Sequence, residues 1–129
     1  MVGETMLVEV IDEKIIRLGR EFLDQLRKRI LIQDAFWMTM DDGKLKLWFV
    51  SQQMDTVGPI RLFEKAQKTL DRFNAANYPY SHFRLTLSRI GFLSPSDPFV
   101  NEAKTRRRVN EFADFSVYDT FFYVIAGTH

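Results

Sequence analysis

Hydrophobic residues recur every three or four positions along the first quarter of the chain, the spacing of an amphipathic helix. The apolar stripe consists of Leu7, Ile11, Ile15, Leu18, Phe22, Leu26 and Ile30. Weak alternation over residues 6–11 leaves an early strand as the alternative, in which case Asp12 caps a helix that starts there. Gly19 falls inside the helix, where glycine costs about 1 kcal/mol relative to alanine.

The pattern then changes to two strand-like runs, AFWMTM at 35–40 and KLKLWFVS at 44–51, around the turn residues Asp41-Asp42-Gly43. A two-residue turn at Asp42-Gly43 makes one face of the hairpin wholly apolar. The resulting pairs are Met40–Leu45, Met38–Leu47 and Phe36–Phe49 on that face, and Thr39–Lys46, Trp37–Trp48 and Ala35–Val50 on the other. A three-residue loop pairs Met38 with Lys46 and mixes the faces, so the burial pattern favours the two-residue turn.

Prolines mark the start of two further helices, because a proline at the first helical position loses no hydrogen bond. Pro59 precedes an apolar stripe of Leu62, Ala66, Leu70 and Phe73. Pro98 follows Asp97, a suitable cap, and begins a helix over about 98–112 with few apolar residues.

Two more strands complete the pattern. One lies within residues 83–93, where a phase change across Gly91 predicts a bulge or a turn followed by a strand. The other is TFFYVIA at 120–126, which is apolar on both faces and is therefore predicted to be central. The order helix, hairpin, helix, strand, helix, strand predicts an α+β fold with a four-stranded mixed sheet and helices mainly on one face. The strand order stays open.

Composition narrows the classes of function. The 129 residues have room for one core, so we expect a single globular domain over 1–129 with the 46% hydrophobic content of a soluble protein. The absence of cysteine excludes disulfides, cysteine-ligated metal centres and thiol catalysis. No apolar run approaches 18 residues and no secretory leader pattern opens the chain, which predicts a cytoplasmic protein without membrane contact.

Several short motifs belong together as a pattern. They are Ala35-Phe36-Trp37, Leu47 with Val50-Ser51, Asp55 with Gly58-Pro59, and Ser94-Pro95 with Asp97-Pro98. Over about residues 30–99 this pattern resembles an uncharacterised bacterial family of small α/β proteins. The resemblance implies a bacterial, intracellular setting and a shared fold, and it brings no assigned activity, cofactor or catalytic residue.

Residue types that carry chemistry are sparse. His82 and His129 are the only histidines, and neither has a second histidine at ligand spacing. Glu102-Ala103-Lys104 matches half of a metal-dependent nuclease motif but falls in a predicted helix. The aspartates around the hairpin are turn formers and caps: Asp34, Asp41, Asp42 and Asp55. No catalytic residue, metal ligand or cofactor is assigned, and an enzyme that uses carboxylates with His82 remains an alternative.

The aromatic residues outside the core stripes predict a binding surface. The two-residue turn places Trp37 beside Trp48, and Tyr78 and Tyr80 extend this candidate interface. The leading prediction is a non-catalytic protein-interaction module, either a homodimer or a subunit beside an unidentified protein partner.

A basic run offers a second binding mode. Lys104, Arg106, Arg107 and Arg108 are candidate contacts for phosphate or nucleic acid. Four acidic residues bring the net charge of residues 101–129 to zero, and the whole chain carries only +1. Nucleic-acid or phosphate binding is therefore an alternative rather than the leading prediction.

Overall fold

One four-stranded mixed sheet organises the part of the chain that the computed structural model describes, which is residues 8–77, 84–108, 110 and 112–125. The strands are β1 (Asp34–Thr39), β2 (Leu45–Val50), β3 (Ile90–Leu93) and β4 (Thr120–Phe122). Their order is β3-β2-β1-β4, with β1 antiparallel to both β2 and β4 and with β2 parallel to β3. The predicted α+β class with a mixed four-stranded sheet is confirmed.

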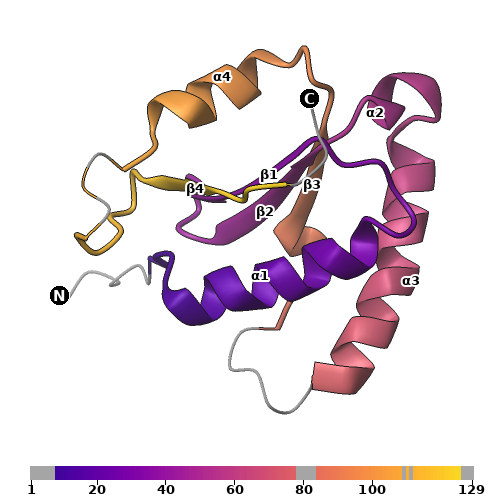
Figure 1. Ribbon diagram of the computed structural model, residues 1–129, viewed down its shortest axis with the longest axis horizontal. Coiled ribbons are helices and arrows are strands. Elements are labelled where there is room, and N and C mark those ends of the chain that lie inside the picture. Colours follow the sequence, from indigo (N-terminus) through magenta and orange to yellow (C-terminus); the bar gives the residue numbers. More distant parts are fainter. Residues whose placement is uncertain (1–7, 78–83, 109, 111, 126–129) are drawn as a thin grey trace, which may run out of the picture.

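Helices cover the two faces of the sheet unequally (Figure 1). The helices are α1 (Glu13–Leu26), α2 (Gln53–Thr56), α3 (Pro59–Asn77) and α4 (Pro98–Thr105), with a 3-10 turn η1 (Leu87–Arg89) before β3. The long helices α1 and α3 pack on one face around a large core that includes Phe22, Phe49 and Leu70. The short α4 covers the other face over a smaller core around Phe36 and Val100. The long helices therefore share one face, as predicted.

The helix starts follow the local capping signals. The side chain of Asp12 accepts the Ile15 N–H at 2.9 Å, and Asp97 accepts the Phe99 N–H at 2.9 Å. Residues 8–12 form neither strand nor helix, and α1 begins at Glu13 with Asp12 as its cap, so the helix starts after Ile11 of the predicted stripe. Helix α4 ends at Thr105 rather than near residue 112, because the chain turns and the next carbonyl accepts an N–H from the start of β4.

The hairpin register differs from the predicted one by a single residue. Asp41-Asp42-Gly43 form a three-residue loop, and Gly43 adopts φ +81°, a left-handed conformation that favours glycine. The observed pairs are Phe36–Trp48, Trp37–Leu47, Met38–Lys46 and Thr39–Leu45. The prediction assumed one covered face, but α4 covers the second face as well, so mixing the two faces carries no burial penalty.

Strand β4 lies at the edge of the sheet, and its predicted central position is wrong. Its side chains enter both helical layers, since Phe121 and Tyr123 pack with the α1 side and Phe122 stacks on Phe36 at 4.8 Å. An edge strand covered on both faces has the same apolar pattern as a central one. The pattern therefore reports coverage of the faces and not the number of neighbouring strands.

Helix α1 approaches the sheet most closely at Gly19. A Cβ atom there would lie 2.2 Å from the Tyr123 hydroxyl oxygen and 2.5 Å from Trp37 Nε1. The Trp37 indole N–H donates to the Tyr123 hydroxyl at 2.8 Å, and that hydroxyl donates to the Ile16 carbonyl at 2.6 Å. Burial raises the pKa of Tyr123 far above its usual value, so the hydroxyl keeps the proton that it donates.

Gly19→Ala is expected to destabilise the fold although alanine is the better helix former. Helix propensity favours the variant by about 1 kcal/mol, but the added methyl overlaps a buried hydrogen-bonded pair, and such overpacking costs about 1–3 kcal/mol. Chemical denaturation of the variant and of Lys14→Ala, an exposed change on the same helix, gives the comparison. A Gly19→Ala protein more stable than wild type would show that α1 does not need this close approach.

Candidate functional site

The predicted pairing of Trp37 with Trp48 at an aromatic interface is not present in the structure. Trp37 is fully buried under α1, while Trp48 lies half-buried on the opposite face of the sheet, because the observed register moves the two rings apart. The prediction that Trp37 and Trp48 lie side by side is therefore wrong. Tyr78 and Tyr80 lie outside the described residues, and their part in an interface stays a prediction.

Trp48 has a packing role on the α4 face. Its ring lies over Gly91, where a Cβ atom would approach Trp48 Cζ3 to 2.2 Å, and it meets Phe99 edge-on at 5.3 Å between centroids. The ammonium of Lys46 lies 4.4 Å from the ring centroid. Its buried indole nitrogen has no hydrogen-bond partner among the described residues. The Trp48 ring therefore packs between β3 and α4 and offers little accessible contact surface.

The arginine run braces the segment that connects α4 to β4. Arg106 donates to the carbonyls of Tyr118 at 2.9 Å and Val117 at 3.4 Å. Arg108 donates to the Ala113 carbonyl, and its guanidinium lies 3.8 Å from the centroid of the Phe115 ring. These two guanidinium groups therefore already have partners within their own connection.

The remaining cations of that run are more open. Arg107 is exposed with its guanidinium 4.2 Å from the Phe122 ring centroid, and Lys104 is exposed on α4. The structure brings no further positive side chain of the run to the same surface. Phosphate or nucleic-acid binding here stays a prediction that rests on Lys104 and Arg107.

The candidate catalytic groups are dispersed. Over the described residues, no three histidine, aspartate or glutamate side chains gather where they would hold a metal ion. Asp42 accepts the Lys44 N–H at 3.0 Å and Asp55 accepts the Ser94 hydroxyl at 2.8 Å, which are turn and loop contacts. The Glu102–Lys104 triplet lies on α4, and His82 and His129 lie outside the described residues.

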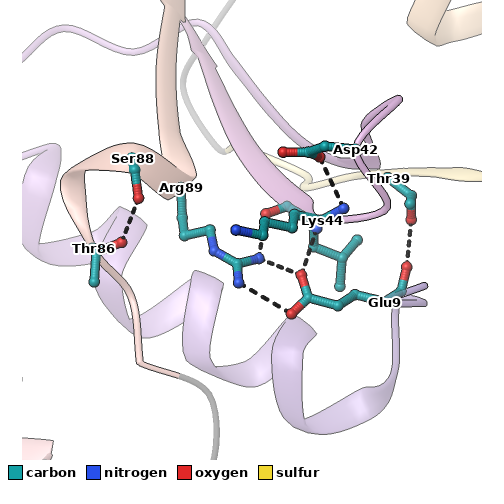
Figure 2. Close-up of polar contacts among 8 residues, drawn as sticks. Glu9, Thr39, Asp42, Lys44, Thr86, Ser88 and Arg89 are labelled. Carbon is teal, nitrogen blue, oxygen red and sulfur yellow. Dashed lines mark hydrogen bonds and ion pairs between the residues drawn. The ribbon is translucent and has the colours of Figure 1, made fainter. Parts of the chain in front are cut away.

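One polar cluster joins the segment before α1 to the sheet, and sequence reasoning does not detect it (Figure 2). Both Nη atoms of Arg89 donate to the Glu9 carboxylate, Nη2 to Oε2 at 3.1 Å, and Nη1 also donates to the Leu45 carbonyl at 3.2 Å. The Glu9 backbone adds two bonds, accepting the Thr39 hydroxyl at 2.7 Å and donating its N–H to the Gly43 carbonyl at 2.8 Å. The cluster therefore fastens residues 8–12 to the hairpin and to η1.

These contacts shift the pKa of the Glu9 carboxyl. Partial burial would by itself raise its pKa, but hydrogen bonds from Arg89 and the Leu45 N–H, with the charges of Arg89 and Lys44, outweigh burial. The net effect is a pKa below the ordinary value. Every hydrogen-bonding group of the cluster has a structural partner, which points to a fastening role rather than to catalysis.

Three exposed apolar residues belong to the segments that meet where α2 joins the start of α3, and we call this set the end patch. Its members are Leu31, Val57 and Ile60, which are 47%, 40% and 75% exposed. Figure 1 shows α2 beside the N-terminal end of α3. Clustered exposed apolar side chains rimmed by polar residues are typical of contact surfaces.

Hydrogen bonds hold the end patch in one arrangement. The buried Ser51 hydroxyl donates to the Leu31 carbonyl and accepts the Gln53 N–H at 3.1 Å. The Gln53 side chain accepts the Leu31 N–H at 3.1 Å, and its carbonyl accepts the Val57 N–H at 2.9 Å. Both backbone groups of Leu31 are thereby fixed, and the exposed side chains are presented on a rigid base.

Sequence reasoning missed the end patch, although a signal exists. Ile60 is out of phase with the buried α3 stripe that begins at Leu62, and Val57 falls in a polar turn. Apolar residues that fit no predicted core stripe were the available indication. Their clustering depends on the fold of residues 51–60, which no spacing rule predicts.

Comparison of the chain with protein-family models, with curated proteins and with solved structures finds no match. The family resemblance drawn from residues 30–99 accordingly stays an expectation. No helix in the described part of the chain is both long and apolar enough to cross a membrane.

Glu9→Gln is expected to lower the free energy of unfolding by about 1 kcal/mol at pH 7, because it removes the charge that Arg89 contacts. The folded-state pKa of Glu9 is depressed, so the stabilisation is present above its ordinary pKa of 4.5 and is lost as pH falls through the folded-state pKa. Denaturation midpoints between pH 7 and pH 3 measure the difference. With Glu102→Gln as the exposed control, a wild-type advantage that persists undiminished at the acid end would contradict this assignment.

Proposed function

We propose that the chain is a protein-interaction module that forms a homodimer through the end patch. The observation that carries the proposal is the exposed set Leu31, Val57 and Ile60 on the hydrogen-bonded base of Ser51 and Gln53. Side chains that are already ordered before association lose less conformational entropy on binding. The hydrogen bonds to Leu31 and Val57 fix the backbone beneath these side chains before association.

Charge supports a second copy of this chain as the partner. The exposed residues Arg61 and Glu64 border Ile60 on α3, and Glu64 lies one helical turn from it. A two-fold interface brings the same surface of both copies together, so each Arg61 can face the other copy's Glu64. With a net charge of +1, the chain has little overall electrostatic repulsion against a second copy.

Sedimentation equilibrium over a range of concentrations tests the proposal. The wild-type chain is expected to approach twice its 15.2 kDa mass as concentration rises. The variant Leu31→Glu/Ile60→Glu places like charges across the interface and is expected to weaken association by roughly a hundredfold or more. Glutamate near the start of a helix is compatible with the helix dipole, so Ile60→Glu leaves α3 intact.

Val124→Glu is the matched control, because it makes the same apolar-to-acidic change at an exposed residue far along the chain. It is expected to leave the dimer unchanged. Circular dichroism verifies that all variants are folded. A wild-type chain that stays monomeric at roughly millimolar concentration, or a double variant that dimerises like wild type, would overturn the proposal.

A further inference from the structure

An open groove lies between α1 and α3. Its volume is about 750 Å³, within the range of small-molecule sites. Thr69, Arg72, Phe73 and Ala76 line it from one face of α3, at the i, i+3, i+4, i+7 spacing. Glu21, Gln25 and Lys28 line it from α1 and the turn that follows, with the same spacing. Two regular helix faces therefore form its walls.

The groove concentrates positive charge. Lys28, Arg29 and Arg72 line it against a single carboxylate, Glu21. Over residues 8–77, 84–108, 110 and 112–125, no carboxylate forms an ion pair with any of these three cations. In a chain of net charge +1, this local excess is a specific feature of the groove. It favours an anionic ligand.

The residues at the base of the groove and its other polar groups further narrow the chemical class of the ligand. Phe73 and Thr69 are buried at the base, while Lys28 and Arg72 are exposed at the walls and Arg29 is half-buried. Guanidinium groups bind phosphate oxygens with paired hydrogen bonds. Glu21 supplies carboxylate acceptors that suit hydroxyl groups, whereas the Gln25 side-chain oxygen already accepts from the Lys28 ammonium at 3.3 Å. A site of this size holds much more than an inorganic anion.

We propose that the groove binds a small organic phosphate ester with a hydroxylated body. Lys28, Arg29 and Arg72 contact the phosphate, and Glu21 accepts hydrogen bonds from hydroxyl groups of the body. The site shares no residue with the end patch, and Phe73 lies 13 residues beyond Ile60 on α3, about 20 Å along the helix axis. Ligand binding and dimerisation can consequently be tested apart.

Calorimetric titration with ribose 5-phosphate, adenosine monophosphate, inorganic phosphate and ribose tests the proposal. At least one ester is expected to bind roughly tenfold more tightly than inorganic phosphate, and ribose is expected not to bind. The two esters separate a sugar phosphate from a nucleotide as the source of the phosphate. Binding of the ester is expected to weaken as salt rises, since the attraction is between exposed charges.

Variants assign the binding to the groove. Lys28→Gln/Arg72→Gln is expected to lose at least roughly tenfold in ester affinity, whereas Lys14→Gln/Lys68→Gln removes two exposed charges outside the groove and is expected to retain it. Glu21→Ala is expected to weaken the ester but not inorganic phosphate. Because Leu31 lies two positions from Arg29, the same titration in a chain with Ile60→Glu alone separates a failure here from a failure of the dimer.

Three outcomes would overturn the proposal. The first is the absence of binding of both esters up to roughly 10 mM, and the second is inorganic phosphate binding as tightly as the tighter-binding ester. The third is an equal loss of affinity in the groove and control double variants. The last outcome would show a general electrostatic attraction to the surface of the chain instead of a site.

Discussion

The contact of α1 with the sheet at Gly19 is the constraint on which the rest of the fold depends. The missing side chain lets the helix lie directly on Trp37 and Tyr123, and the indole and hydroxyl then find all their partners within the contact. On the same helix, the Phe22 ring meets the Phe73 ring of α3 edge-on, with 5.5 Å between the ring centroids. The Phe22–Phe73 contact joins α1 to α3 beside the groove, while Gly19 sets the approach of α1 to the sheet.

Local chemistry made much of the fold predictable. Asp12, Asp97, Pro59 and Pro98 act within a few residues of themselves, so their effects on helix starts hold in any tertiary context. The order of the strands and of the helices α1, α3 and α4 was correct because each amphipathic stripe reports its own period, whereas the short elements α2 and η1 were not predicted. The α+β class followed from that order without knowledge of any long-range contact.

Long-range coverage was the part that the sequence could not reveal. Coverage of the second face of the sheet by α4 decides whether a hairpin register that mixes apolar and polar residues on each face is tolerated. The hairpin register in turn decided on which faces Trp37 and Trp48 lie. The predicted aromatic interface depended on the same coverage by α4. Glu9 and Arg89 are separated by 80 positions, and the cations of the groove come from the turn after α1 and from α3, so neither set forms a motif.

Strand β4 leaves a sheet edge that would ordinarily invite further strands, and the chain blocks it. The Thr120 N–H is occupied by the Arg106 carbonyl, and the Val124 carbonyl by the Arg20 guanidinium at 2.7 Å. An incoming strand would have to displace both contacts to form a continuous ladder. Growth of the sheet from one molecule into the next, the first step of fibrillar aggregation, is thereby obstructed along this edge.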